Sequence, residues 1–356
     1  MTALQPTPQP QALALPMTLE LLLVHCQGEI GKVLVAGAPD IPGATMLDKM
    51  NHINRHDDRL RRFLTGEPRA HVAMSVNLLL PPTRPDADAG FIVLQSDRAH
   101  AMSGSNCICV VTALLETGRV PIRGPVTEVR LDTPAGLVVA TARCEGGRCL
   151  SVSLDNVPCF AEALDREVQS TRWGPLRIDV AFGGVYYALV DVAQTGLAIV
   201  PEQARALAEA GVALRAELAG QVRVAHPLLP GVDEIAYVMF RQRLDSGEVR
   251  TCTTLPPGRV DRSPCGTGSS AHLATLFARG EVRVGDHRVS RSIIGGEFRV
   301  EAIGATEVAG RPAVLPRITG RGTVFGREQL VWREDEPFAD GFLLSDTWGP
   351  GLESFA

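Results

Sequence analysis

Short apolar segments with the alternation of β-strands recur along most of the chain, and Gly and Pro separate them. In the first half a strand pair around a polar insert is followed by shorter strands, at 19–36, 72–80, 90–94, 126–131, 136–142 and 152–154. The second half has a similar series, at 176–190, 234–242, 249–255, 282–289, 295–303 and 313–325. A spacing of roughly ten residues with turn residues between strands predicts antiparallel sheet rather than βαβ units.

Helical patterns are fewer. Residues 44–64 have an Asp- and Arg-rich face, and residues 201–218 form an amphipathic segment rich in Ala, Leu and Glu. Two further apolar runs follow Ser103-Gly104 and Cys265-Gly266. Strands that outnumber helices in this arrangement predict an α+β fold.

The two runs share one layout. Ser103 and Cys265 stand 162 positions apart, each is followed by Gly and a helix-like run, and another Gly lies fifteen positions after each start. This repeat predicts two pseudo-symmetric lobes, each a mostly antiparallel sheet around a central helix. A helix N-terminus offers free N–H groups and the positive end of the helix dipole, which suit a carboxylate. Two such helices facing each other would hold one small acid between the lobes, with Ser103 on one side and Cys265 on the other.

A chain of 356 residues is too long for one ordinary core, and two domains of about 150 residues are expected. We predict a flexible lead-in at 1–16, a first lobe made of 17–149 with 335–356, and a second lobe at 150–334. The lead-in has four Pro and no basic residue, so it does not read as a signal peptide. The predicted location is the cytoplasm.

Composition excludes several classes of function. A net charge of −5 and the lack of clustered Lys and Arg argue against nucleic-acid binding. No run approaches the ~18 apolar residues of a membrane span. Neither GxGxxG after a strand nor GxxxxGK[ST] occurs, so nucleotide cofactors are not expected.

The eight cysteines do not form paired CxxC motifs with His, so we expect no metal site. Most are expected to be buried thiols of a protein in a reducing compartment. The lone histidines, His25, His71 and His272, are interpreted as structural.

The segment from Asp261 to Gly268 is the most specific in the sequence. Its glycines allow a ligand to approach the backbone. A thiol at a helix N-terminus is expected to have a lowered pKa, which would make Cys265 an acid or base near neutral pH. The alternative is a buried structural cysteine beside a Gly-rich turn, and the repeated layout favours the functional reading.

Ser103 and Asp261 each allow two interpretations. A serine at the start of a helix can simply be its N-cap, although its hydroxyl could also donate a proton or bind a substrate. Asp261 could pair with a substrate ammonium, or it could be an ordinary surface carboxylate near a helix start.

Taken together, these segments resemble the proline racemase family, which includes hydroxyproline 2-epimerase and trans-3-hydroxy-L-proline dehydratase. The likeness covers almost the whole chain. It is carried by His25–Gly28 with Glu29, Glu67-Pro68-Arg69 before His71, Met102–Gly104, Phe182–Gly184 with Tyr187–Asp191, Asp261–Gly268, Ser292–Gly295 and Phe338–Phe342. The resemblance implies two lobes of the diaminopimelate-epimerase type and no cofactor.

By position, the resemblance places Ser103 and Cys265 where a racemase has its two catalytic thiols. It implies that the carboxylate is held by Gly104, Ser105, Gly266 and Thr267, and that Asp261 binds the ring nitrogen. Two departures stand out. The first catalytic position is Ser rather than Cys, and Ser105-Asn106 stands where racemases and epimerases commonly have His-Gly.

These departures favour the dehydratase. In trans-3-hydroxy-L-proline the Cα hydrogen and the hydroxyl share one ring face, so a single group could take the proton and return it to the leaving oxygen. The product would be Δ1-pyrroline-2-carboxylate and water. The sequence leaves open whether Ser103 or Cys265 is that group.

Two other functions remain open. Ser at the first position is also compatible with a 4-hydroxyproline 2-epimerase or a racemase-type isomerase. A non-catalytic imino-acid-binding protein that lost one thiol is a minor alternative. The expected partner is hydroxyproline, and a homodimer is compatible with the residues but not required by them.

Overall fold

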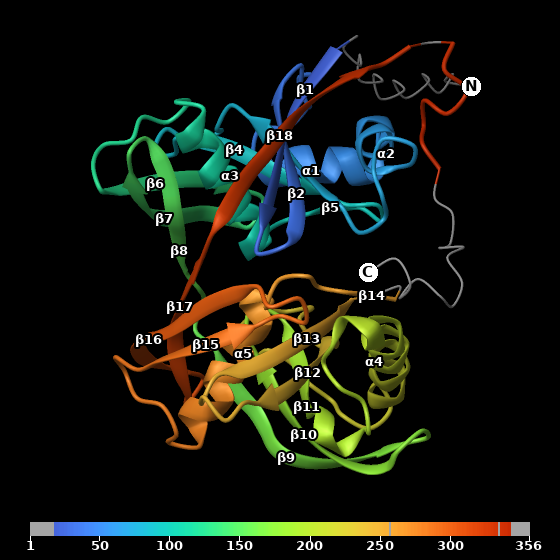
Figure 1. Ribbon diagram of the computed structural model, residues 1–356, viewed down its shortest axis with the longest axis vertical. Coiled ribbons are helices and arrows are strands. Elements are labelled where there is room, and N and C mark those ends of the chain that lie inside the picture. The colour runs from blue at the N-terminus through green and yellow to red at the C-terminus, as the bar shows by residue number, and fades with distance from the viewer. Residues whose placement is uncertain (1–17, 256–257, 334, 343–356) are drawn as a thin grey trace, which may run out of the picture.

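The chain folds into two lobes stacked along the long axis of the molecule (Figure 1). The computed structural model describes residues 18–255, 258–333 and 335–342. The lead-in predicted at 1–16 and the end of the chain from 343 lie outside the described residues.

The helices of the first lobe in the described residues are α1 (Met46–Arg55), α2 (Arg59–Thr65) and α3 (Gly104–Glu116). Its strands are β1 (Thr18–Cys26), β2 (Glu29–Ala36), β3 (Ser75–Leu80), β4 (Ala89–Leu94), β5 (Ala99–His100), β6 (Val126–Thr133), β7 (Gly136–Glu145), β8 (Arg148–Asp155) and β18 (Gly322–Val331).

The second lobe holds α4 (Ala204–Leu218), α5 (Gly266–Ala278) and two 3₁₀ turns, Val192–Gln194 and Pro201–Gln203. Its strands are β9 (Phe160–Ser170), β10 (Gly174–Phe182), β11 (Tyr186–Asp191), β12 (Ile235–Arg243), β13 (Val249–Leu255), β14 (Arg259–Val260), β15 (His287–Arg291), β16 (Glu297–Val308) and β17 (Arg311–Gly320).

Both lobes repeat one order of elements. The series β3-β4-β5-α3-β6 corresponds to β12-β13-β14-α5-β15. The strand directions repeat as well, because β2–β3 and β4–β6 pair in parallel in one lobe and β11–β12 and β13–β15 do so in the other. Most other pairs are antiparallel, as between β3 and β4 or β12 and β13. The predicted α+β class with two pseudo-symmetric lobes is therefore confirmed.

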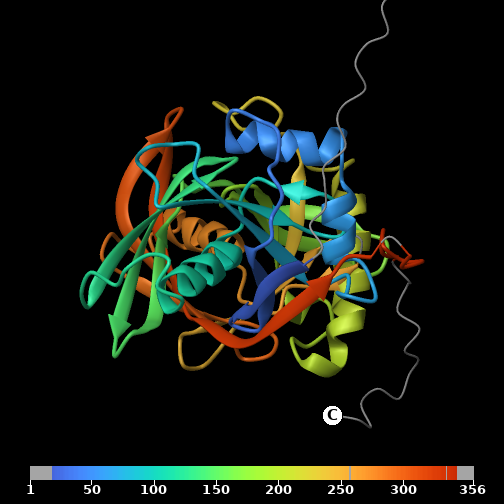
Figure 2. The same cartoon turned by 90° about the horizontal axis from the view of Figure 1, so that it is seen from above.

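The lobes are joined by strands. β8 leads into β9, and the return passes through β17, which pairs with β8, into β18, which pairs with β1. The central helices also meet, because one hydrophobic cluster includes most of α3 together with Leu273 and Ala274 of α5. Figure 2 shows these helices from above. The domain boundaries expected from the sequence, 17–149 with 335–356 and 150–334, stay a prediction, although they assign β18 to the second lobe while the structure pairs this strand with β1 of the first.

Three local predictions were wrong. The helix expected over 44–64 is two helices, because Asp57 accepts hydrogen bonds from the backbone N–H and guanidinium of Arg59 and turns the chain between them. The strand expected over 282–289 begins only at His287, since the Asp286 carboxylate accepts the Arg283 N–H in a turn. Strand β9 was missed because Asp165, at φ 52°, interrupts the alternation of buried and exposed positions.

Two further expectations from the sequence concern the cysteines and membrane-spanning segments. All eight cysteines are free and buried. No helix in the described part of the chain is long and apolar enough to cross a membrane.

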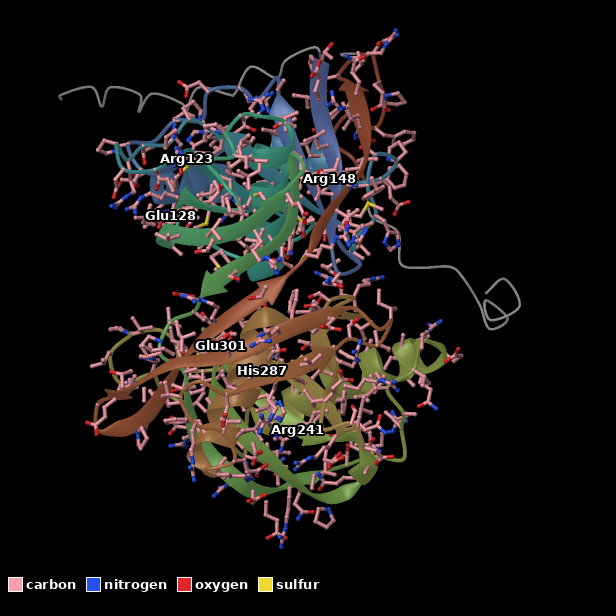
Figure 3. All side chains as sticks on the ribbon, turned by 60° about the vertical axis from the view of Figure 1, so that its left-hand side comes forward. Arg123, Glu128, Arg148, Arg241, His287 and Glu301 are labelled. Atoms are coloured by element: carbon pink, nitrogen blue, oxygen red, sulfur yellow. The ribbon has the colours of Figure 1, made fainter. Side chains whose placement is uncertain are left out.

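A buried ion cluster fixes the end of α5 in the second lobe. Asp179 of β10 accepts hydrogen bonds from Arg241, at 2.5 Å, and from both terminal nitrogens of Arg279, at 2.8 Å. Figure 3 shows the position of Arg241 in this lobe. Burial works against the charge on Asp179, but the Arg279 hydrogen bonds and the Arg241 charge hold the pKa of this carboxyl below its usual value. Because Arg279 caps α5, the cluster anchors the helix that Cys265 begins.

Replacing Asp179 by Asn is expected to lower the free energy of unfolding by about 3–5 kcal/mol, because Arg241 loses its buried carboxylate partner and Arg279 keeps its ion pair with the exposed Asp165 but loses the buried one. The matched control is Asp155→Asn, which breaks an exposed pair with Arg317 and should cost less than about 1 kcal/mol. Urea denaturation near pH 7 measures both. The Asp179 contribution is full above the unfolded carboxyl pKa, about 4, and is lost as the pH falls through the lower folded value. Equal losses in the two variants would contradict the anchoring role.

Candidate active site

Ser103 is the N-cap of α3, but its side chain does not act as a cap. The backbone has the extended geometry of an N-cap, φ −154° and ψ 128°, and the hydroxyl accepts no capping hydrogen bond. Its oxygen instead accepts a hydrogen bond from Nδ2 of Asn106 at 2.9 Å and lies 3.3 Å from the Ser105 hydroxyl. The capping interpretation of Ser103 is therefore not supported by its contacts.

Cys265 begins α5 in a strained conformation. Its φ of 63° lies in the region that non-glycine residues rarely adopt, and such strain concentrates at functional sites. Its thiol makes no cap, and lies 3.4 Å from the hydroxyl of Tyr187 and 3.9 Å from that of Thr267. Tyr187 and Thr267 are themselves joined at 2.6 Å. A Cβ added at Gly268 would lie 3.2 Å from the thiol sulfur, so this glycine leaves room for it.

Asp261 is tied to the Cys265 backbone through Ser263. Its Oδ1 accepts the N–H and the hydroxyl of Ser263, each at 2.8 Å, and the Ser263 oxygen accepts the Cys265 N–H at 3.1 Å. Asp261 is buried rather than at the surface. The loop therefore holds carboxylate and thiol in a fixed relation.

Strand β2 of the first lobe connects the two loops. Its first residue, Glu29, accepts hydrogen bonds from the Arg259 guanidinium at 2.8 Å and the Arg262 backbone N–H at 2.9 Å, both in the second lobe. Two residues further, Gly31 lies against the Asn106 amide of α3. Positions two apart share one face of a strand and lie about 6.6 Å from each other. Strand β2 therefore contacts the Asp261 loop of the second lobe through Glu29 and the start of α3 through Gly31.

Charge and burial at this junction oppose the pKa expected for Cys265. Burial and the nearby Asp261 carboxylate raise the pKa of Cys265 to about 11, although the Tyr187 hydroxyl acts in the other direction. The lowered pKa predicted for Cys265 from the helix terminus was therefore wrong, because desolvation of the thiol outweighs the effect of the helix dipole. Burial and the neighbouring Glu29 raise the pKa of Asp261 to about 7.

Both helix starts leave N–H groups available to an anion. The first backbone hydrogen bond of each helix goes to its N-cap residue, from the Cys107 N–H to the Ser103 carbonyl and from the Ser269 N–H to the Cys265 carbonyl. The N–H groups before them are the ones a helix cannot satisfy by itself. They include those of the predicted carboxylate-binding residues, Gly104, Ser105, Gly266 and Thr267. A Cβ added at Gly104 would have no described atom within 4 Å, so α3 begins beside open space.

Several polar residues of this region were not singled out as site residues from the sequence. They are Glu29, Asn77, Asn106, Tyr187 and Arg259. Asn106 had a signal, since it departs from the His-Gly of the resembling enzymes, and Glu29 and Tyr187 fell within quoted segments. Within residues 18–255, 258–333 and 335–342, no three His, Cys, Asp or Glu side chains are grouped so that they could hold a metal ion.

Comparison with known proteins identifies the family of the chain. The family model described as proline racemase matches residues 21–343. The chain belongs to the proline racemase family.

Curated members of the family resemble the chain over nearly its whole length. A protein of Rhizobium rhizogenes named 4-hydroxyproline 2-epimerase 1 is 53% identical over 335 residues, which are 94% of this chain and 97% of that protein. A 4-hydroxyproline 2-epimerase of Agrobacterium fabrum is 52% identical with the same coverage.

A solved member has the same fold. The crystal structure of a hydroxyproline epimerase from Agrobacterium vitis, with bound trans-4-hydroxy-L-proline, has a TM-score of 0.84 and 53% identity and covers 95% of this chain and 98% of that one. Methylitaconate-delta-isomerase, 12% identical with a TM-score of 0.53 over 94% of this chain and 99% of that one, shares the fold alone.

These relatives overturn the prediction of a trans-3-hydroxy-L-proline dehydratase, and with it the assignment as a hydro-lyase. Relatives at 53% identity are named as epimerases, which are isomerases. The prediction failed because it took Ser103 for a weak substitute for a thiol. A hydroxyl that accepts an amide N–H at a helix start can still exchange a proton, so a Ser/Cys pair does not by itself select elimination.

Proposed function

We propose that this protein interconverts the Cα epimers of 4-hydroxyproline without a cofactor. Cys265 would exchange a proton with one face of Cα and Ser103 with the other. The observation that carries the proposal is the 53% identity, over nearly the full chain, to curated 4-hydroxyproline 2-epimerases. The bound trans-4-hydroxy-L-proline in the structure of the A. vitis relative supports the same substrate.

The arrangement suits the chemistry of epimerisation. Inversion at Cα needs one group to remove the proton from one face and another to deliver a proton to the opposite face. Two helix starts that approach from different lobes can supply these groups. Removal of a weakly acidic Cα proton also places negative charge on the substrate carboxylate. We propose that the free N–H groups at Gly104, Ser105, Gly266 and Thr267 stabilise that charge as it forms.

Asp261 is proposed to bind the ring nitrogen. A protonated imino acid carries positive charge on that nitrogen, and a buried carboxylate is a strong partner for it. The cation would in turn lower the pKa of Asp261 on binding. The same positive charge, brought beside Cys265, would favour the thiolate form of that residue.

The direct test is incubation of the purified protein with trans-4-hydroxy-L-proline and no added cofactor. We expect cis-4-hydroxy-D-proline, which chiral chromatography separates, and incorporation of deuterium at Cα of the product in D₂O. Ser103→Ala should slow the reaction by about 10²- to 10⁴-fold, because one face loses its proton-transfer group.

Other outcomes would reject this function. Imine formed from trans-3-hydroxy-L-proline, detected with o-aminobenzaldehyde, together with no epimer from the 4-hydroxy substrate, would mean elimination instead. Thermal stabilisation by hydroxyproline without any turnover would indicate a binding protein.

A further inference from the structure

The Ser103 hydroxyl is held by an amide, not by a basic side chain. Nδ2 of Asn106 donates to its oxygen at 2.9 Å. Ser103 and Asn106 are the N-cap and the third residue of α3. In an ordinary helix start the N-cap oxygen would accept the backbone N–H of that residue or the one before. Here the side-chain amide has replaced the backbone as the donor, which turns the hydroxyl oxygen away from capping.

The orientation of the Asn106 side-chain amide is fixed by its hydrogen bond with Asn77. Nδ2 of Asn77 donates to the Lys32 carbonyl at 3.3 Å and to Oδ1 of Asn106 at 3.0 Å. A carbonyl can only accept, so the Asn77 amide must turn its nitrogen toward Lys32 and Asn106. The oxygen of Asn106 must then face Asn77, and its nitrogen must face Ser103.

The pairing of the Asn77 and Asn106 amides leaves one buried polar atom without a hydrogen bond. Asn77 and Asn106 are buried, and Oδ1 of Asn77 has no hydrogen-bond partner among the described residues. Gly31 of β2 makes the space, because a Cβ there would lie 2.5 Å from Oδ1 of Asn106 and 3.0 Å from Nδ2 of Asn77. A buried unsatisfied acceptor in a native protein calls for an explanation, and orientation of Asn106 supplies one.

We propose that Asn106, braced by Asn77, is a positioning residue that allows Ser103 to serve as the proton-transfer group on its face of Cα. The inference rests on the proposed epimerisation, which it extends to residues outside the substrate-binding loops. An N–H donor stabilises an alkoxide more than a neutral hydroxyl. It therefore compensates in part for the lower acidity of serine relative to cysteine at this position.

The proton transfers at Cα show when the Asn106 amide would act. When Cys265 removes the Cα proton, the S–H bond forms and the Cα–H bond breaks. On the other face the Ser103 O–H bond breaks and a new Cα–H bond forms, which leaves the electron pair on Oγ. The Asn106 N–H faces that oxygen. In the reverse direction the same oxygen takes the proton, and Cys265 gives one back.

A double-mutant cycle separates this role from a structural one. Asn106→Ala should lower kcat for trans-4-hydroxy-L-proline by about 10- to 100-fold, the worth of a hydrogen bond to a charged group, with little change in KM. In the Ser103→Cys background the same substitution should lower kcat by no more than about threefold, because a thiol ionises far more readily than a hydroxyl. Equal losses in the two backgrounds would overturn the proposal.

Two controls accompany this cycle: a variant of similar shape at position 106, and a measurement that does not depend on turnover. Asn106→Leu has nearly the same shape and no donor, so it should reproduce the loss seen with Ala if the N–H matters. In Ser103→Cys, the alkylation rate of the new thiol by iodoacetamide, followed by peptide mass spectrometry, reports its thiolate fraction without any turnover. Adding Asn106→Ala should slow that alkylation by about threefold, because the roughly tenfold loss of thiolate expected when a hydrogen bond to a charged group is lost is partly offset by the greater nucleophilicity of a more basic thiolate.

The two proposals can fail independently. If the wild-type protein does not epimerise hydroxyproline, the proposed function fails, and the alkylation comparison still decides whether Asn106 stabilises negative charge at position 103. An unchanged alkylation rate would reject the role of Asn106 even in an active epimerase.

Discussion

Replacement of Cys265 by alanine is expected to lower the rate of 4-hydroxyproline epimerisation by about 10³- to 10⁴-fold, at the upper end for loss of an acid–base group. The thiol is buried beside Tyr187 and Thr267 at the start of α5. Both of these neighbours are hydroxyls, which are weaker acids than a thiol, so we expect neither to replace its proton transfer. Chiral chromatography of the product measures the loss.

The Cys265→Ala variant should still bind substrate, because the proposed carboxylate and nitrogen contacts come from other groups. Thermal stabilisation by trans-4-hydroxy-L-proline should therefore remain. Cys159→Ala is the matched control, since it removes another buried free thiol and should leave the rate within a few-fold. Retention of most activity in Cys265→Ala would disprove the two-group assignment, and equal loss in both variants would point to a general effect on folding.

The second large effect is expected at Asp261. Asp261→Asn should lower kcat/KM by about 100-fold, mainly through KM, because the substrate nitrogen would meet a neutral amide instead of a buried carboxylate. Asn can still accept the two hydrogen bonds from Ser263 at its oxygen, so the loop geometry should survive. Initial rates over a range of substrate concentrations separate KM from kcat. A change confined to kcat would contradict a role in binding the nitrogen.

Asp261 also predicts the pH dependence of the reaction. Its pKa is raised to about 7 by burial and by Glu29, so it is partly protonated at neutral pH. Because the ionised form binds the cationic nitrogen, kcat/KM should rise with pH through about 7. The titratable groups that interact with this carboxylate are Glu29, Arg259, Cys26, Cys252 and Cys265.

The variant Glu29→Gln tests whether the Glu29 charge raises the pKa of Asp261. Removing the like charge should lower the pKa of Asp261 and move the rise in kcat/KM to lower pH. A carboxyl with a raised pKa also makes the folded protein less stable as the pH rises from about 4 to about 7, because the folded state binds the proton more tightly. Asp261→Asn should therefore not reduce the melting temperature at pH 8. An unmoved pH profile in Glu29→Gln would reject the assigned coupling.

Much of the fold could be read from local patterns. The loop-and-helix layout at Ser103 and Cys265 identified the internal repeat, and the structure gives both helices the same length, Gly104–Glu116 and Gly266–Ala278. Such features are local, because a helix start depends on residues within one turn of it. Interruptions by side chains or backbone strain, as at Asp57 and Asp165, are weaker signals and were missed.

The reaction could not be read from the same residues. Ser in place of Cys favoured elimination when the loop was considered alone, and the chain's epimerase relatives contradicted this. The environment of the Ser103 hydroxyl also depends on Asn77 and Gly31 from other strands, which the loop sequence does not show. Acidity is set by neighbours in space, so residue type and helix position alone misjudged the pKa of Cys265.

The sequence by itself determined the two lobes, the two helix starts and the candidate pair Ser103 and Cys265, since each follows from short-range pattern and from an internal repeat. Only the tertiary structure decided how the lobes contact each other. Glu29 contacts Arg259 across 230 positions of sequence, and the same strand packs Gly31 against Asn106. Contacts of this kind leave no periodic signal in the chain, because they arise when strands fold together and bury polar groups that must then find partners.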